Sequence, residues 1–320
     1  MHQLPMLGGF ITVVATDAFQ AVLMVFTCVV LPIIALGIAA TYNINIAETI
    51  AQASYTIPLN VETAKQATGG LLILNGLSWA FGYTGQPQLL TRMMAMRNKK
   101  DVQKSRWLAV AWTLLAYGGA FMIGIIGFKL VQAGALGDAA SAVTTDAEKI
   151  MPIMVMTLLN PILAGILLSG AVSAMMSTAS SQLMVVSSSM TEDFYLHVTT
   201  KKKIKEKRLL FLNRILTLIV GLAGFVLAIT MKDTVYGLVS YAWSGIGASF
   251  GPAIVLLIFW KRFSRAGVFA SLITGTVSAV VWKTWLLEPT GISERLASYL
   301  LAFFMAVVFS LIFPEKKNKT

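Results

Sequence analysis

The sequence predicts an all-α protein that crosses a membrane several times. Of its 320 residues, 57% are hydrophobic and only 12% are charged, and the mean hydropathy is +0.76. A soluble domain carries about 25% charged residues. Apolar runs of about 20 residues recur along the whole chain, and each is long enough to cross roughly 30 Å of hydrocarbon. Together these observations exclude an ordinary soluble protein.

About eight segments are predicted to be transmembrane helices. They cover residues 9–40, 67–95, 107–131, 159–190, 209–231, 235–260, 266–287 and 296–314. Together they predict one transmembrane domain over residues 1–320.

The positions of the basic residues predict the orientation of these helices. The formal net charge is +11, which would also suit a protein that binds nucleic acid. Most Lys and Arg residues, however, fall on alternate loops, at 97–106, 200–208 and 261–265, and in the tail after residue 314. By the positive-inside rule these regions are cytoplasmic. We therefore expect a multi-pass protein of the cell membrane, in contact with lipid and not nucleic acid, with both termini in the cytoplasm.

The first span carries an acidic residue, Asp17, near its start. An ionisable group inside a membrane is costly unless it is hydrated, paired or bound to an ion, so Asp17 is a candidate functional residue. An acidic side chain that reaches the cytoplasmic interface is an equal alternative.

The second span is predicted to be broken at Gly82-Tyr83-Thr84-Gly85-Gln86-Pro87. Pro87 has no N–H, so the carbonyl of Tyr83 loses its helical partner. Broken helices at membrane depth are typical of the binding sites of transporters. Trp79 and Tyr83, one turn apart, would share a face upstream of the break. A proline kink between packed helices is the alternative.

The fourth span places Ala174, Ser177, Thr178 and Ser181 on one helical face, because they are spaced i, i+3, i+4 and i+7. Two hydroxyls and a carbonyl can coordinate a small hard cation such as Na⁺. Small residues at this spacing also let membrane helices pack closely. The glycines of the sixth span, from Ser240 to Pro252, are likewise compatible with close packing or with hinging.

Enzyme chemistry is not expected. With one cysteine and two histidines, the chain lacks the residues for a conventional His/Cys metal site. The predicted spans hold no combination of nucleophile, base and orienting group.

Four motifs, taken in order, resemble the sodium/solute symporter family, and most closely its sodium/proline branch. They are GGFITVVATDAFQ at 8–20, WAFGYTGQPQLLTRMMAMR at 79–97, NPILAGILLSGAVSAMMSTASSQLMVVSSSMTEDFY at 160–195 and GLVSYAWSGIGASFGP at 237–252. The resemblance covers essentially the whole chain. It implies an inverted five-helix-repeat symporter fold with substrate and ion near the middle of the membrane.

The resemblance also implies roles for single residues. Trp79, Tyr83 and Pro87 match positions for the substrate. The carbonyl of Ala174 and the hydroxyls of Ser177 and Thr178 match the sodium site, and Asp17 matches an acidic residue linked to sodium handling. The implied function is symport of Na⁺ with a small amino acid, proline first, into the cell, with Na⁺ as coupling ion and no cofactor.

The chain departs from the family at its start, because its first helix resembles the last helix of the first repeat and the first five spans are absent. In the family, the broken first core helix completes both the sodium site and the substrate pocket, so this chain would hold half of each. Either the upstream sequence was lost through truncation, a frameshift or a misplaced start, or a partner chain, the missing amino-terminal half, supplies it. The alternatives are a truncated fragment that does not transport, a membrane sensor or interaction module, and a symporter for another solute such as pantothenate.

Overall fold

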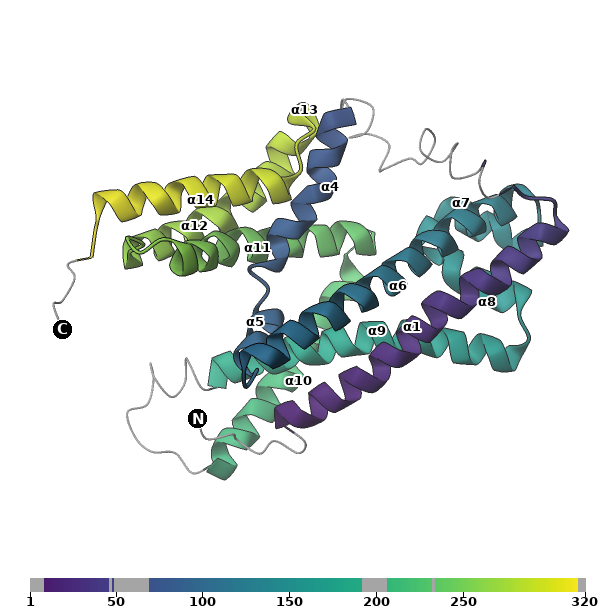
Figure 1. The fold of residues 1–320 in the computed structure, drawn as a ribbon, viewed down its shortest axis with the longest axis horizontal. Coiled ribbons are helices and arrows are strands. Elements are labelled where there is room, and N and C mark those ends of the chain that lie inside the picture. Colours follow the sequence, from purple (N-terminus) through teal and green to yellow (C-terminus); the bar gives the residue numbers. More distant parts are fainter. Residues whose placement is uncertain (1–8, 46–47, 49–68, 192–205, 232–233, 316–320) are drawn as a thin grey trace. The chain divides into compact units, whose positions relative to one another are not determined.

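The computed structural model describes the chain except for residues 1–8, 46–47, 49–68, 192–205, 232–233 and 316–320 (Figure 1). The helices gather in two compact units. Residues 1–56 and 95–231 make the first unit, and residues 57–94 and 232–320 make the second. The single domain expected from the sequence remains a prediction. Much of the basic loop at 200–208 and of the basic tail lies outside the described residues.

The first unit is built on a long helix that packs against two others. Its helices are α1 (Gly9–Thr41), α6 (Lys99–Gln132), α7 (Ala140–Thr145), α8 (Ile150–Leu158), α9 (Pro161–Ser188) and α10 (Glu206–Thr230). Helix α1 packs against α6 and α9. Leu31, Ile126, Leu130, Met154 and Leu167 form a fully buried core among α1, α6, α8 and α9. This apolar core holds α1 and α9 side by side, which matters for the site below.

The second unit contains the broken helix and the last three long helices. Its helices are α4 (Gly69–Tyr83), α5 (Pro87–Met94), α11 (Val235–Phe259), α12 (Arg265–Val281), α13 (Leu287–Thr290) and α14 (Glu294–Ile312). A π-helical turn at Trp282–Leu286 joins α12 to α13. Helix α12 lies along α14, and α4 contacts both α11 and α14 (Figure 1).

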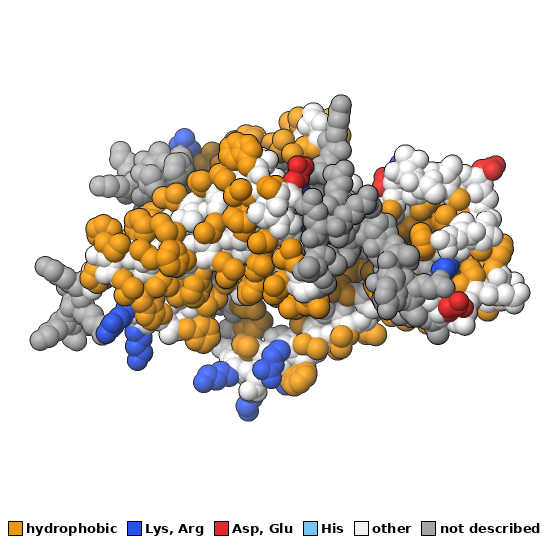
Figure 2. All heavy atoms as spheres, turned by 90° about the horizontal axis from the view of Figure 1, so that it is seen from above, with side chains coloured by type: hydrophobic (Ala, Val, Ile, Leu, Met, Phe, Trp, Pro, Cys, Tyr) orange, Lys and Arg blue, Asp and Glu red, His pale blue; other side chains and the backbone are white. Residues whose placement is uncertain are grey.

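The all-helical membrane class predicted from the sequence is confirmed. Among the described residues, seven helices are long and apolar enough to cross a membrane. They correspond to seven of the predicted spans. Figure 2 shows hydrophobic side chains over much of one face of the surface. Among the exposed apolar side chains, that of Phe259 has 81% of its area accessible. Such a surface is stable in hydrocarbon and not in water.

The remaining predicted span, 67–95, is the broken one. It consists of α4 with 15 residues and α5 with 8 residues, separated by Thr84, Gly85 and Gln86. The break predicted before Pro87 is therefore confirmed.

One predicted boundary is wrong. The third span was expected to begin at residue 107, after a basic loop, but α6 begins at Lys99. The side chain of Asn98 accepts a hydrogen bond from the N–H of Asp101 at 2.9 Å and caps the helix. Because an N-cap needs no apolar residue, hydropathy alone misses a helix start that lies in a charged segment.

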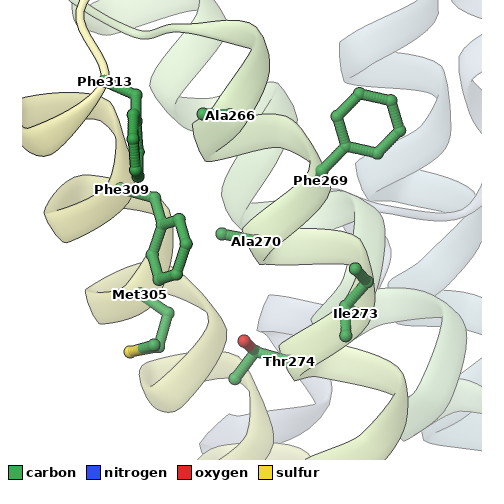
Figure 3. A pocket seen from close by; sticks show the side chains of 8 residues that line it. All are labelled: Ala266, Phe269, Ala270, Ile273, Thr274, Met305, Phe309 and Phe313. Atoms are coloured by element: carbon green, nitrogen blue, oxygen red, sulfur yellow. The ribbon is translucent and has the colours of Figure 1, made fainter.

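An apolar groove lies along the outside of the second unit between α12 and α14 (Figure 3). Its volume is about 450 Å³, and it is lined by Ala266, Phe269, Ala270, Ile273, Thr274, Met305, Phe309 and Phe313. None of these eight residues is a predicted site residue. The lining suits a surface that faces acyl chains.

Candidate functional site

The three predicted sodium ligands lie together on α9. The hydroxyl of Ser177 donates to the carbonyl oxygen of Ala174 at 3.0 Å, and the hydroxyl of Thr178 donates to the same oxygen at 3.2 Å. Three neutral oxygens are therefore gathered at one point of the helix. Hydroxyls bonded back to a helical carbonyl keep their lone pairs for another ligand. Their chemistry fits a hard, weakly bound cation.

Asp17, a residue of α1, contacts α9 near these ligands. Its Oδ2 accepts a hydrogen bond from the hydroxyl of Ser181 at 3.1 Å. The carboxylate is half-buried and Ser181 is buried. Ser181 lies one helical turn beyond Ser177 and Thr178, on the face that the sequence spacing predicted. The structure therefore brings the acidic candidate to the end of the same polar stripe.

Small side chains bring α1 and α9 close enough for this contact. A Cβ atom on Gly170 of α9 would collide with the side chain of Thr27 on α1. The hydroxyl of Thr27 donates to the carbonyl of Leu167 at 3.1 Å, and Thr27 itself is buried. This close approach holds the two helices against each other, and the contact between Asp17 and Ser181 lies further along the same pair.

The sequence reasoning missed Gln20, which lies one turn after Asp17 on α1. Its side-chain oxygen is buried and accepts no hydrogen bond within the part of the chain that the structure describes. An amide oxygen is a ligand that hard cations accept. The residue was visible in the motif that ends TDAFQ, and its spacing of three from Asp17 was the available signal.

The predicted substrate residues lie in the second unit, on and after α4. The rings of Tyr83 and Trp243 meet edge to face, with centroids 4.8 Å apart. The Trp79 ring lies 6.1 Å from that of Trp243 and 5.7 Å from that of Tyr236. The indole N–H of Trp243 donates to the carbonyl of Trp79 at 3.3 Å. These contacts build an aromatic cluster from α4 and α11.

Trp243 and Tyr236 were not among the predicted site residues. Trp243 stands inside the motif at 237–252 that carried the resemblance, but the sequence reasoning used only the glycines of that motif. The structure explains the glycines too, because a Cβ on Gly82 would collide with the Trp243 ring, and one on Gly247 would press on the backbone of Gly82. Glycine on both helices therefore lets the ring lie against α4.

At the break, the backbone compensates for Pro87. The N–H of Gln86 donates to the carbonyl of Tyr83 at 3.4 Å, in place of the N–H that Pro87 lacks. The carbonyl of Gln86 then begins α5, accepting from Leu89 and Leu90 at 3.1 Å each. Pro87 is half-buried at the first position of α5, where proline is well tolerated.

Gln86 itself is a further residue that the sequence reasoning passed over. It is only 1% exposed, and its side-chain NH₂ group has no acceptor among the described residues. A buried amide donor at a helix break is available for an anionic or carbonyl group of a ligand. Trp79 and Tyr83 of the aromatic cluster lie within a few residues of this amide on the broken helix.

The match to a family model identifies the chain. The model described as the sodium:solute symporter family matches residues 1–275. The chain belongs to this family. An all-helical symporter fold and a multi-pass membrane location follow from this membership and from the helices described above, and the family is one of transporters, not of enzymes.

Three similar proteins, all described as proline transporters, belong with this assignment. The chain is 34% identical over 315 residues to sodium/proline symporter 2 of Staphylococcus saprophyticus and 35% identical over 308 residues to the sodium/proline symporter of Escherichia coli. It is 32% identical over 306 residues to an osmoregulated proline transporter of Bacillus subtilis. The alignments cover 98%, 96% and 95% of this chain but only 59%, 59% and 60% of these relatives.

A solved structure shows the fold. It is that of a Na⁺-coupled sialic acid symporter in a substrate-bound, outward-open state, with a TM-score of 0.72 and 18% identity. It covers 98% of this chain, which in turn covers 65% of that symporter. Because the match covers nearly the whole chain, the likeness in fold includes residues of both units.

Proposed function

We propose that this chain carries out sodium-coupled uptake of proline into the cell, as the carboxyl-terminal part of a symporter. The observation that supports this most directly is the convergence of the Ser177 and Thr178 hydroxyls on the Ala174 carbonyl, at 3.0 and 3.2 Å. Neutral oxygens bind Na⁺ weakly and reversibly, as a coupling ion requires. No cofactor is needed for this work.

Proline suits the aromatic cluster on chemical grounds. Its pyrrolidine ring is apolar and packs against aromatic faces, and its ammonium group is attracted to them. Trp79 and Tyr83 supply such faces, with Trp243 between them. The carboxylate requires a hydrogen-bond donor, and the buried NH₂ group of Gln86 is one. The named relatives that transport proline support the same choice.

Coupling follows from linkage between the two sites. If Na⁺ at Ala174, Ser177 and Thr178 stabilises the outward-open state that presents Trp79 and Tyr83, each ligand raises the affinity for the other. In this proposal Asp17 lies on the sodium pathway, because a carboxylate beside the polar stripe raises the local Na⁺ concentration and lowers the cost of dehydration. Pro87 maintains the break between α4 and α5 next to the proposed substrate residues.

The orientation is part of the proposal. By the positive-inside rule, the basic loops favour a cytoplasmic position for both termini and an outside position for the connections at 41–66 and 132–158. In its membrane the chain would contact lipid, and an amino-terminal half would be its protein partner, since the chain spans about three fifths of the length of the relatives it matches.

Radiolabelled proline uptake tests this function. The chain would be expressed in bacteria without proline uptake of their own, alone and together with a separate chain that carries the remaining amino-terminal spans of the Escherichia coli relative. We expect sodium-dependent uptake in at least one arm, reduced by unlabelled proline more than by pantothenate or glucose. No uptake in either arm, while the complete relative is active in the same cells, would overturn the proposal.

Such a failure, if accompanied by a stable complex with another membrane protein, would favour the interaction module. Stronger competition by pantothenate than by proline would favour another solute of the same family.

A further inference from the structure

A buried ion pair opens the last helix, next to the aromatic cluster. Glu294 and Arg295 are the first two residues of α14, and they are 3% and 8% exposed. Their charged atoms lie 3.5 Å apart. Charged side chains inside a membrane protein are costly and are retained for a purpose. Neither residue belongs to the sodium or substrate positions described above.

Arg295 lies over the ring of a predicted substrate residue. The centre of its guanidinium group is 4.4 Å from the centroid of the Trp79 ring. A guanidinium at this distance from an indole face makes a cation–π contact, which is strongest where water is excluded. Arg295 is thus in direct contact with the side chain that we assign to substrate binding.

Serine hydroxyls from two helices, α4 and α11, fix the position of the guanidinium. Its Nε donates to Ser78 of α4 at 3.2 Å, and its Nη1 donates to Ser240 of α11. The Ser240 hydroxyl in turn donates to the carboxylate of Glu294 at 2.7 Å. Each hydroxyl therefore accepts a hydrogen bond from the arginine and donates one to another acceptor, which is the Asn75 carbonyl for Ser78 and the Glu294 carboxylate for Ser240. A Lys side chain, with a single nitrogen, cannot reproduce this two-armed arrangement.

The start of α14 is itself fastened to α4. The side chain of Asn75 donates to the carbonyl of Gly291 at 2.8 Å and accepts from the N–H of Ser293 at 2.9 Å. Ser78 donates to the carbonyl of Asn75 at 2.6 Å, so its 3.1 Å contact with Ser293 uses the proton of Ser293. These contacts fix the start of α14 against α4. Arg295 is therefore held beside Trp79, which directly follows Ser78 in the sequence.

Two apolar residues would hold three helices together at least as well, because buried ion pairs contribute little net stability. What an apolar pair cannot do is orient an indole ring by its charge. The carbonyl of Trp79 also accepts from Trp243, whose ring meets Tyr83. A change in the orientation of Trp79 would therefore also affect Trp243 and Tyr83, through these contacts.

We infer that Arg295, with its charge balanced by Glu294, is a positioning residue that holds the Trp79 ring in the orientation that receives the substrate. This inference rests on the proposed function for its transport consequence, but the contact itself is independent of transport. It predicts that Arg295 acts through Trp79 and not directly on the solute.

Fluorine NMR of the purified full chain tests the contact. The tryptophans would be replaced by 5-fluorotryptophan, and the Trp79 signal assigned from the spectrum of Trp79→Phe. We expect Arg295→Met to shift this signal and broaden it, and Arg295→Lys to shift it less. The control is Arg265→Met, since Arg265 is exposed and pairs with Glu315 at the surface. A Trp79 signal that is unchanged in Arg295→Met would overturn the inference.

The transport readout is the proline concentration for half-maximal uptake, measured in the arm of the uptake assay that is active. We expect Arg295→Met to raise it about tenfold, the size of a desolvated cation–π contact, with little change in the sodium requirement. The effects of Arg295→Met and Trp79→Phe should not multiply in the double variant, because both disturb one contact. Fully multiplicative effects would overturn the positioning role.

The two readouts separate the possible failures. A shifted Trp79 signal without uptake by the unmodified chain would leave the contact established and refute the proposed function. If Arg295→Met does not fold, as judged by size-exclusion chromatography, Glu294→Gln and Arg295→Lys serve instead. Both keep the positive charge, and a Trp79 signal unchanged in both variants would then overturn the inference.

Discussion

The carboxylate of Asp17 accepts a hydrogen bond from the hydroxyl of Ser181 at 3.1 Å, although the two residues are 164 positions apart in the sequence. This bond ties α1 to the polar face of α9, one turn from Ser177 and Thr178. It gives the acidic residue a defined place beside the candidate sodium ligands. The relationship supports a role in sodium handling for Asp17 and makes a prediction.

Asp17→Asn is expected to raise the sodium concentration for half-maximal proline uptake about tenfold or more. The amide still accepts from Ser181 but has lost the negative charge that attracts Na⁺. Ser181→Ala keeps the charge and should raise the same concentration only about threefold, the cost of one hydrogen bond. The sodium dependence of uptake measures both effects.

Asp146→Asn is the matched control, because Asp146 is a surface residue that pairs with Lys149. It should leave the sodium dependence unchanged. Equal sodium requirements in Asp17→Asn and Asp146→Asn would remove Asp17 from the sodium pathway.

The double variant Ser177→Ala with Thr178→Ala is expected to increase the sodium requirement steeply, by about a hundredfold. It removes two of the three oxygens gathered at Ala174, and a hard cation bound by few ligands cannot lose two of them. Thr178→Ser retains its hydroxyl and should restore much of the affinity when Ser177 is present. Sodium titration of proline uptake is the measurement.

Ser169→Ala serves as the control for this pair. Ser169 is an exposed residue of the same helix, and its hydroxyl makes the same kind of bond, to the carbonyl of Ile166 at 2.6 Å. Its removal should not change the sodium requirement. If the double variant behaves like Ser169→Ala, close helix packing is the better interpretation of the serine-rich face.

Trp243→Leu is expected to raise the proline concentration for half-maximal uptake about tenfold, while the sodium requirement changes little. The ring contacts both Trp79 and Tyr83, and loss of an aromatic pair costs about 1 kcal/mol beyond the area lost. Trp285→Leu removes an indole that is 70% exposed and is the control. A Trp243 variant with unchanged proline affinity would remove α11 from the proposed substrate site.

The sequence was sufficient for those features that depend on local patterns. The break before Pro87 follows from the missing N–H, and the shared face of Ala174, Ser177 and Thr178 follows from helical spacing. Seven spans were recognisable by hydropathy, because a membrane requires long apolar runs. The start of α6 was misjudged, because its cap lies in a charged segment.

Contacts between distant segments were not predictable from one sequence. Nothing in the spacing of Asp17 indicates that Ser181 is its partner, and nothing near Trp79 indicates that Arg295 covers its ring. In the sequence, Glu294 and Arg295 directly precede the predicted span 296–314, where charged residues usually lie at the membrane surface. Such pairs depend on how helices cross, which is decided by small residues on both partners.

Gly82 is one of these small residues, and it leads to a prediction about stability. A Cβ atom added to Gly82 would collide with the Trp243 ring, whereas one added to Gly76 of the same helix would meet nothing within 4 Å. We expect Gly82→Ala to reduce the free energy of unfolding by about 1–3 kcal/mol, as overpacking does. Gly76→Ala should leave it unchanged or raise it by up to about 1 kcal/mol through better helix propensity.

Thermal unfolding of the two variants in detergent, followed by tryptophan fluorescence, gives the comparison. Because both substitutions add one methyl group to the same helix, a difference between them reports the crossing of α4 and α11 and not helix propensity. Equal unfolding temperatures would mean that the Trp243 ring moves freely away from α4. In that case the aromatic cluster could not hold Trp79 and Tyr83 in place for a substrate.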